Sequence, residues 1–448
     1  MGGFSQLARS ASVRGATSVM AAGHLRGSVS VPPSKSYTHR AVLMASLAQT
    51  SRSGSGSRIR NPLLSRDTNA TVEACAAMGA QMDRREGVLT IRGTRPMLPD
   101  DVVNVENSGT TLRFMTSAFS LAPEGYAVLT GDSSIRRRPM QPLLDTLGQL
   151  GVQTWSSRHN GCAPIVVKSG GMRGGKASIR GDVSSQFISS LLISSPMAEI
   201  DTVLKVADAV SRPYIEMTLR LAKHFGVKIL KRGYTEFEVS SGQEYRAADF
   251  TVPADFSSAS FIVAAVALIG GRVRFENLDA RLPQGDEKII EIVRRMGVKV
   301  SEEKGALVVA SDGDRLSGGT FDLGDTPDLL PVVSALALRC DTAVEIVGTA
   351  HARFKETDRI AIIAKELSKL GVSVKEREDG LKIMPLKGRL EAAPMDAHDD
   401  HRMFMAFSLA SMLIPGGAPI LGAESLDVSY PTFLEDIKRL GAKVKRGG

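Results

Sequence analysis

Cysteine, aromatic residues and long apolar runs are all scarce in this sequence. The three cysteines, Cys75, Cys162 and Cys340, lie far apart in 448 residues and form no CxxC pair. We therefore expect neither a disulfide framework nor a cysteine-based metal site, a usage that suits the reducing cytoplasm. Aromatic residues make up only 5% of the chain, which disfavours stacking on nucleic-acid bases. No apolar run reaches the roughly 18 residues that a membrane span needs.

Acidic residues are missing from the first part of the chain. The first one is Asp67, and the residues before it include eight Arg and one Lys, so this segment accounts for the whole net charge of +8. Such asymmetry indicates an anionic partner, and we favour a phosphorylated small molecule. A protein that binds RNA or processes RNA ends is an alternative, supported by the pI of about 9.4. Residues 1–15 are expected to be a disordered extension.

A glycine that follows a helical pattern recurs every 70 to 75 residues. The residue after a helix often has positive φ, which glycine adopts without strain, and a following Val or Ala can begin a strand. The six copies are at Gly79, Gly151, Gly226, Gly297, Gly371 and Gly441. We therefore predict six helix-and-strand modules that pack on one another.

Six modules suggest two lobes of three, with residues 241–253 as a hinge and a small-molecule site in the cleft between the lobes. Further helices are expected at residues 145–150, 189–192, 214–225, 259–268, 358–370 and 402–412. Further strands are expected at residues 127–131, 164–170 and 306–313.

The segment SKSYTHR (34–40) combines cations and hydroxyls at a predicted helix start. Pro32 and Pro33 disfavour helix before it, and a Ser or Thr can cap the helix that follows. The first turn would then present Lys35, Ser36 and Arg40, and a helix N-terminus of this kind binds anions. A capped surface helix with a solvated basic end is the alternative.

Several later stretches repeat this chemistry, although each could be an ordinary helix cap or basic turn. They are NSGTTLR (107–113), SSIRRRPM (133–140), SSQ (184–186), SRPY (211–214), RFKETDR (353–359) and DDHR (399–402). Asp328 follows Pro327 before an apolar helix and becomes a candidate base only if partial dehydration raises its pKa toward neutrality. His398 and His401 match no strong metal-ligand spacing.

Together and in this order, these stretches resemble the family of 5-enolpyruvylshikimate-3-phosphate synthases, from about residue 16 to residue 441. The resemblance implies an inside-out α/β barrel with two lobes, each made of three βαβαββ units. The N-terminal lobe would comprise residues 34–253. The C-terminal lobe would comprise residues 16–33 and 254–448, with the active site between the lobes.

The resemblance also implies an activity. The family transfers the enolpyruvyl group of phosphoenolpyruvate to the 5-hydroxyl of shikimate 3-phosphate, releasing phosphate by addition and elimination. This is the sixth step of the shikimate pathway to chorismate and aromatic amino acids, and it is the target of glyphosate. No metal or other cofactor, no nucleic acid and no membrane is implied, and the enzyme would be a cytoplasmic monomer.

Roles are carried over position by position. Asp328 would accept the 5-hydroxyl proton, and Glu356 with Lys35 would protonate the methylene carbon. Shikimate 3-phosphate would be bound by Lys35, Ser36, Arg40, Ser184, Ser185, Gln186, Ser211, Tyr214, Asp328 and Lys355. Phosphoenolpyruvate would be bound by Lys35, Asn107, Gly109, Arg138, Gln186, Arg359 and Arg402.

Three positions depart from the commoner family pattern. Val428 stands where many members have a Lys that reaches phosphoenolpyruvate, His351 replaces a frequent Asn, and Phe114 replaces a frequent Pro. We expect Val428 and Phe114 to weaken glyphosate more than substrate. The nearest rival is UDP-N-acetylglucosamine enolpyruvyl transferase, which would show a different lysine motif and a reactive Cys in a mobile loop.

Overall fold

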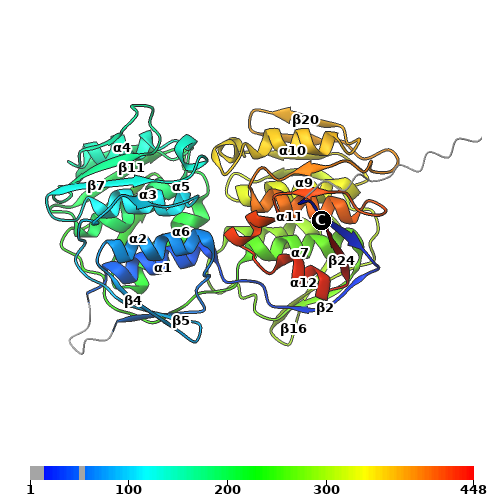
Figure 1. The fold of residues 1–448 in the computed structure, drawn as a ribbon, viewed down its shortest axis with the longest axis horizontal. Helices are drawn as coiled ribbons and strands as arrows, with labels where there is room; N and C mark the ends of the chain where they lie inside the picture. The colour runs from blue at the N-terminus through cyan, green and yellow to red at the C-terminus, as the bar shows by residue number, and fades with distance from the viewer. Residues whose placement is uncertain (1–14, 50–55, 448) are drawn as a thin grey trace, which may run out of the picture.

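The computed structural model describes residues 15–49 and 56–447. The extension expected at residues 1–15 lies, except for Gly15, outside this range. The chain forms two lobes that lie side by side (Figure 1). One hydrophobic core is built from residues between 37 and 252. The other is built from residues 19–31 together with residues between 254 and 442.

The N-terminal lobe contains three four-stranded sheets and six helices. In spatial order the sheets are β14 (Phe250–Thr251), β3 (Ser57–Arg60), β5 (Val88–Arg92) and β4 (Gln81–Arg85); β6 (Val103–Asn104), β7 (Gly125–Thr130), β9 (Ile165–Ser169) and β8 (Thr154–Ser156); and β10 (Gly175–Arg180), β11 (Thr202–Ala207), β13 (Glu236–Val239) and β12 (Ile229–Arg232). The helices are α1 (Lys35–Leu47), α2 (Arg66–Ala77), α3 (Gly109–Phe119), α4 (Gln141–Gln149), α5 (Ser185–Ser194) and α6 (Arg212–His224).

The C-terminal lobe repeats this arrangement. Its sheets are β16 (Lys299–Glu303), β17 (Ala306–Ser311), β15 (Gly271–Phe275) and β2 (Leu25–Val29); β18 (Gly319–Asp322), β19 (Val344–Val347), β21 (Gly380–Ile383) and β20 (Val374–Arg377); and β22 (Met395–Asp396), β23 (Ile420–Leu421), β1 (Thr17–Ala21) and β24 (Ala442–Arg446). Its helices are α7 (Phe256–Ile269), α8 (Lys288–Arg295), α9 (Leu330–Leu336), α10 (Arg359–Ser368), α11 (His401–Met412) and α12 (Phe433–Arg439).

All six sheets have the same plan of one parallel pair followed by two antiparallel pairs. The predicted glycines all have positive φ, between 80° and 116°, and a strand at one edge of a sheet begins one to three residues after each of them. The prediction of six modules is therefore confirmed. The expected helices all overlap observed ones, with ends that differ by up to four residues. The sheets are separate, so the described residues form no closed barrel.

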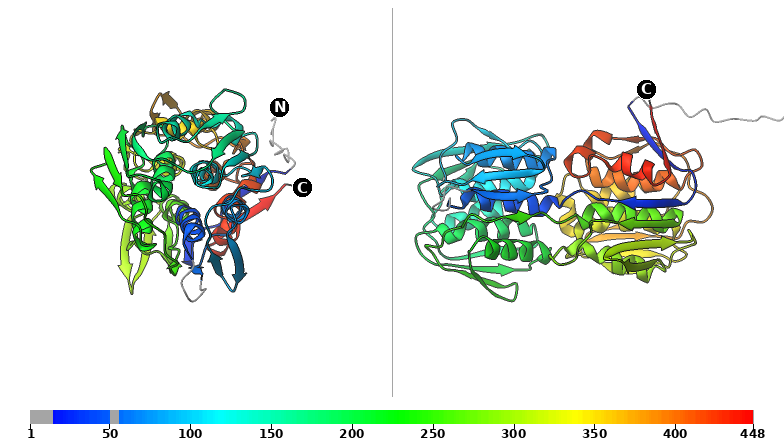
Figure 2. Two further views of the ribbon diagram at one scale, coloured as in Figure 1. Left: turned by 90° about the vertical axis from the view of Figure 1, so that its left-hand side faces the viewer. Right: turned by 90° about the horizontal axis from the view of Figure 1, so that it is seen from below.

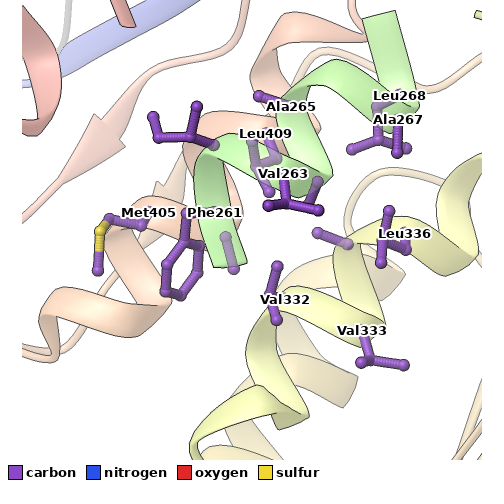
Figure 3. Packing of buried hydrophobic residues seen from close by; sticks show 14 of the residues in the cluster. Phe261, Val263, Ala265, Ala267, Leu268, Val332, Val333, Leu336, Met405 and Leu409 are labelled. Atoms are coloured by element: carbon purple, nitrogen blue, oxygen red, sulfur yellow. The ribbon is translucent and has the colours of Figure 1, made fainter. Parts of the chain in front are cut away.

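Apolar helices lie inside the lobes and the sheets lie outside (Figure 2). In the C-terminal lobe, α7, α9 and α11 pack on one another, and Phe261, Val332 and Met405 meet in their shared core (Figure 3). α3 and α11 bury every residue. A helix that is apolar on all sides is stable only when it is surrounded by other elements. No described helix is long and apolar enough to cross a membrane.

The chain crosses between the lobes twice, and the two crossings are hydrogen-bonded to each other. Ser34 N donates to the carbonyl of Pro253 at 2.7 Å, and Asp255 N donates to that of Pro32 at 2.9 Å. β1 and β2, which precede the first crossing, therefore belong to C-terminal sheets. β14, which precedes the second crossing, pairs in parallel with β3 in the N-terminal lobe. The segment 241–253, expected as a hinge, thus contains a strand of an N-terminal sheet. Lys35 directly follows one crossing.

Candidate active site

A cavity between the lobes brings together the residues that the sequence singled out. From the N-terminal lobe it is lined by Lys35, Ser36, Asp67, Gly109, Thr110, Arg113, Arg138, Val183, Ser184, Ser185, Gln186, Ser211 and Tyr214. From the C-terminal lobe it is lined by Asp328, His351, Phe354, Lys355, Glu356 and Arg402. Of the predicted site residues, Arg40, Asn107 and Arg359 do not line it. A larger cavity of about 820 Å³ lies on the sheet containing β2 and β15, and it contains none of the predicted residues.

Helix starts form much of the N-terminal wall. The Ser108 hydroxyl caps α3 by accepting from Thr111 N, and the Ser184 hydroxyl caps α5 by accepting from Gln186 N. Ser34 occupies the N-cap position of α1, but its hydroxyl makes no capping hydrogen bond, so the predicted cap is only partly realised. Free N–H groups and the helix dipole at such ends favour anions.

Two arginines converge above Gly109. A Cβ at this position would lie 2.5 Å from Arg138 Nη1 and 3.4 Å from Arg113 Nη1, so the approach of the guanidinium groups depends on glycine. Arg113 Nη1 donates to Gln186 Oε1 at 2.5 Å. Burial and the neighbouring Arg138 lower the pKa of Arg113 to about 9. Two like charges this close call for an anion between them.

Three residues that line the cavity have a buried guanidinium nitrogen without a hydrogen-bond partner among the described residues. They are Arg113, Arg138 and Arg402, in each case at Nε; Arg339 Nε is a fourth such atom, away from the cavity. A buried donor without a partner is unfavourable, and a charged one more so. A multiply charged ligand with several oxygen atoms is suited to bind the guanidinium groups of the three lining arginines.

Asp328 is the centre of the C-terminal wall. Its carboxylate accepts from Arg359 Nη1 at 2.8 Å and from the Tyr214 hydroxyl at 3.2 Å, and Arg402 Nη2 lies 3.0 Å away. Burial by itself raises the pKa of Asp328, but Arg402, Lys355 and Arg359 outweigh it and hold that pKa well below its usual range. The condition under which the sequence made Asp328 a candidate base, a pKa raised toward neutrality by dehydration, is therefore not met in this structure, because the nearby cations outweigh the effect of burial.

Arg359 lies behind the wall and holds both candidate acids. It is fully buried and contacts Asp328, Glu356 Oε2 at 2.8 Å and Asp400 Oδ2 at 2.7 Å. Burial raises the pKa of Glu356, but Arg359 and Arg138 hold it well below the usual range. In this structure the guanidinium of Arg359 is saturated by protein carboxylates rather than exposed to the cavity.

Arg40 also lies behind the wall. It donates to the Ser36 carbonyl at 2.9 Å, to Thr218 Oγ1 at 2.8 Å and to the Tyr214 carbonyl at 3.1 Å, and it stacks over the Phe114 ring at 5.3 Å. Arg40 thus donates to the backbone of two residues that line the cavity, Ser36 and Tyr214, and fixes their relative position. The side-chain oxygen of Asn107 is buried without a partner among the described residues.

The sequence analysis assigned no role to two buried carboxylates, Asp67 and Asp286. Asp67 lines the cavity and accepts from Lys35 Nζ at 2.7 Å; its only sequence signal was being the first acid of the chain. Asp286 Oδ2 lies 3.3 Å from the oxygen of the Tyr214 hydroxyl, which therefore lies between the carboxyl groups of Asp286 and Asp328. Burial, with a contribution from Asp328, raises the pKa of Asp286 to about 7.

The three departures from the family pattern have different surroundings. His351 lines the cavity and lies 3.2 Å from Ser211 Oγ of the other lobe. Burial lowers its pKa to about 4, so it is neutral at physiological pH. Phe114 supports Arg40, as described above. Val428 is buried and does not line the cavity.

No group of three or more metal-ligating side chains is arranged to hold a metal ion among the described residues. The architecture and the cavity define a two-lobed α/β protein with a site for anions between its lobes. One wall of that site supplies hydroxyls and cations, and the other supplies ion-paired carboxylates.

Comparison with known proteins gives the family. The family model described as EPSP synthase (3-phosphoshikimate 1-carboxyvinyltransferase) matches residues 19–437. A 3-phosphoshikimate 1-carboxyvinyltransferase of Methanocella arvoryzae is 45% identical, with 94% of this chain and 97% of the relative covered. The enzyme of that name from Methanothermobacter thermautotrophicus is 46% identical, with the same two shares covered.

A solved structure of EPSP synthase from Acinetobacter baumannii has a TM-score of 0.78 at 25% identity, covering 96% of this chain and all of that one. The chain therefore belongs to the EPSP synthase family.

Proposed function

We propose that this protein transfers the enolpyruvyl group of phosphoenolpyruvate to the 5-hydroxyl of shikimate 3-phosphate and releases phosphate. One observation carries the proposal: Arg113, Arg138 and Arg402, each with a buried Nε that has no partner among the described residues, line the same cavity as Asp328 and Glu356. The first are suited to hold phosphate and carboxylate groups, and the second to move protons. The family and the names of the relatives support it.

The two substrates take different parts of the cavity. Shikimate 3-phosphate is bound by the hydroxyls and the amide of the N-terminal lobe, with Asp328 and Lys355 at its ring: the N-terminal set is Ser36, Ser184, Ser185, Gln186, Ser211 and Tyr214. Phosphoenolpyruvate lies between Gly109, Arg138 and Arg402, and Lys35 and Gln186 reach both substrates. Arg40, Asn107 and Arg359 act from behind, by holding residues of the wall, unless ligand binding rotates them into the cavity.

Asp328 is the base in the addition step. It takes the proton of the 5-hydroxyl while that oxygen bonds to C2 of phosphoenolpyruvate, and C3 receives a proton from Lys35. Substrate anions would neutralise Arg402 and Lys355, which removes the main causes of the low pKa of Asp328 and makes it a stronger base. In the elimination step Glu356, which Arg359 keeps ionised, takes a proton from C3 as phosphate leaves C2.

The reaction is tested by a coupled phosphate-release assay with both substrates. Phosphate release that needs both, together with a product containing the enol ether, supports the proposal. Replacing shikimate 3-phosphate by UDP-N-acetylglucosamine tests the rival transferase. Tight RNA binding with a steep salt dependence, and no turnover, would favour the RNA-binding alternative.

We also propose a cytoplasmic monomer whose lobes, residues 34–253 and residues 16–33 with 254–448, move as units. The cavity is completed by one chain, so catalysis requires no second copy. Light scattering during gel filtration tests the monomer. Glyphosate should inhibit weakly, with an inhibition constant above the KM for phosphoenolpyruvate, because Val428 supplies no cation.

A further inference from the structure

Two helices of the N-terminal lobe meet behind Lys35 through a ladder of four polar side chains. Lys35 and His39 are one turn apart on α1, and Asp67 and Thr71 are one turn apart on α2, so each pair lies on one face of its helix. Lys35 Nζ donates to Asp67 Oδ2 at 2.7 Å. His39 Nε2 lies 3.4 Å from Asp67 Oδ1, and its Nδ1 lies 2.7 Å from Thr71 Oγ1. Lys35 thus holds one oxygen of the Asp67 carboxylate by a hydrogen bond, and the His39 ring approaches the other; neither His39 Nε2 nor Asp67 Oδ1 has another partner among the described residues.

The ladder continues to a second point on the cavity wall. Thr71 Oγ1 lies 2.6 Å from Thr111 Oγ1, which lies 2.6 Å from Ser108 Oγ. Ser108 is the cap of α3, and α3 begins at Gly109, which lines the cavity. A buried series of polar contacts therefore runs from the Lys35 ammonium to the start of α3, with a hydrogen bond at every step except the 3.4 Å approach of His39 Nε2 to Asp67 Oδ1.

The charge states of His39 and Asp67 determine which atoms donate and which accept along this series of polar side chains. Burial lowers the pKa of His39, so the ring is neutral and carries a single N–H. Burial raises the pKa of Asp67, but Lys35 and His39 hold it well below the usual range, so it is an anion that only accepts. The His39 proton is then on Nε2, and Nδ1 accepts from the Thr71 hydroxyl.

Lys35 needs such a support more than its neighbours do. Fixing a long lysine side chain opposes its rotamer entropy, and several of the charges around the cavity are also positive. Its one hydrogen bond among the described residues goes to Asp67. An ammonium group has three donors, so two stay available for a ligand.

We propose that Asp67 and His39 are positioning residues for Lys35. Asp67 holds the ammonium at the cavity wall in the rotamer that meets phosphoenolpyruvate, and His39 fixes the Asp67 carboxylate. The proposal rests on the role given to Lys35 above. In this proposal the buried Lys35–Asp67 ion pair positions a reacting group, whereas an ordinary buried ion pair would serve only the packing of α1 on α2.

The kinetic test is Asp67→Asn, which preserves shape but removes the charge. We expect kcat/KM for phosphoenolpyruvate to fall by about 10²-fold, the effect of misplacing a reacting group by roughly 1 Å. The dissociation constant of shikimate 3-phosphate should change less, because the hydroxyls and the amide of the N-terminal lobe also bind that substrate.

The matched control is Glu366→Gln. Glu366 is also fully buried and accepts from a lysine, Lys369 Nζ, at 2.6 Å, but it lies away from the cavity. It should lose thermal stability and keep its kinetic constants. If both variants stay within about twofold of the unaltered protein in kcat/KM, the proposal is overturned.

A second measurement does not need turnover. ¹⁵N NMR of the unaltered protein should show His39 as the Nε2–H tautomer and a slowly exchanging Lys35 ammonium signal. That signal should disappear in Asp67→Asn and persist in Glu366→Gln. Absence of turnover in the unaltered protein would defeat the proposed function while this test still stands. A Nδ1–H tautomer, or a Lys35 signal that survives in Asp67→Asn, would defeat the ladder.

Discussion

The two walls of the cavity handle charge in opposite ways. The N-terminal wall is made of helix starts, hydroxyls and the arginines Arg113 and Arg138, and both of these have a buried Nε without a partner among the described residues. The C-terminal wall has cations too, but they contact carboxylates: Arg402 Nη2 lies 3.0 Å from Asp328 although its Nε has no partner among the described residues, and Arg359 behind the wall contacts Asp328, Glu356 and Asp400. One wall is therefore short of anions, and the other is almost neutral.

This difference separates binding from proton transfer. Unpaired donors on rigid helix ends gain most when an anionic ligand arrives. Carboxylates that are held by arginines keep a low pKa until the ligand competes for those arginines. Neither wall could perform both tasks, so the site is complete only where the lobes meet.

The largest effect is expected from removing the charge of Asp328 in the C-terminal wall. Asp328→Asn keeps the shape of the side chain but removes the proposed base, so turnover should fall by about 10²–10⁴-fold. The dissociation constant of shikimate 3-phosphate, measured by calorimetry, should rise by far less than turnover falls, and the Tm should decrease because Arg359 and Arg402 lose a buried partner. Activity within about tenfold of the unaltered protein would contradict the role of Asp328.

Adding a methyl group to the N-terminal wall at Gly109 should have a smaller effect on the reaction. In Gly109→Ala the new methyl group would lie 2.5 Å from Arg138 Nη1 and must displace that guanidinium. We expect the KM for phosphoenolpyruvate to rise about tenfold while that for shikimate 3-phosphate stays unchanged. Gly148→Ala on α4 is the control, because its Cβ would meet no atom within 4 Å. Equal kinetics in the two variants would show that Arg138 is not held by this glycine.

The buried carboxyl group of Asp286, which contacts Tyr214 of the cavity wall, should also make the stability of the protein depend on pH. The pKa of Asp286 is raised from 3.8 to about 7 in the folded protein, so the native state keeps a proton that the unfolded chain has lost. Stability therefore decreases as pH rises from 3.8 to about 7 and is constant above that range. Asp286→Asn should remove this decrease, giving a Tm a few degrees above that of the unaltered protein at alkaline pH. Parallel Tm profiles across that range would disprove it.

The smallest effect is expected at the exposed contact between the lobes. Arg212 Nε donates to both carboxylate oxygens of Asp325 at 2.9 Å, but an exposed pair is worth about 1 kcal/mol or less. Arg212→Ala should raise the KM for shikimate 3-phosphate by less than about fivefold, and less still at high salt. Arg272→Ala, in a surface pair with Glu303, serves as control. A loss above about tenfold would mean that this pair, rather than the cavity, holds the lobes together.

Local patterns in the sequence were sufficient to predict the modules and most of the site. The glycines after helices recur because each module ends a helix in the same way, and a cap or a proline identifies a helix start without reference to distant residues. Asp67 and Asp286 could not be identified in this way, because nothing near them in sequence shows that a lysine or a tyrosine from another element lies against them. Arg40 and Arg359 were placed at the right end of the right helices, but the side to which a buried side chain points is a matter of packing.

The sequence alone determined where cations and hydroxyls meet helix starts, because these are local events within a few residues. Only the tertiary structure decided the charge state of each group. The segment around Asp328 left open whether dehydration raises its pKa, and in the folded protein that pKa is depressed because Arg402, Lys355 and Arg359 approach the carboxylate. Charge interactions act through space and not along the chain, so the chemistry of this site is set by the elements that the two lobes bring together.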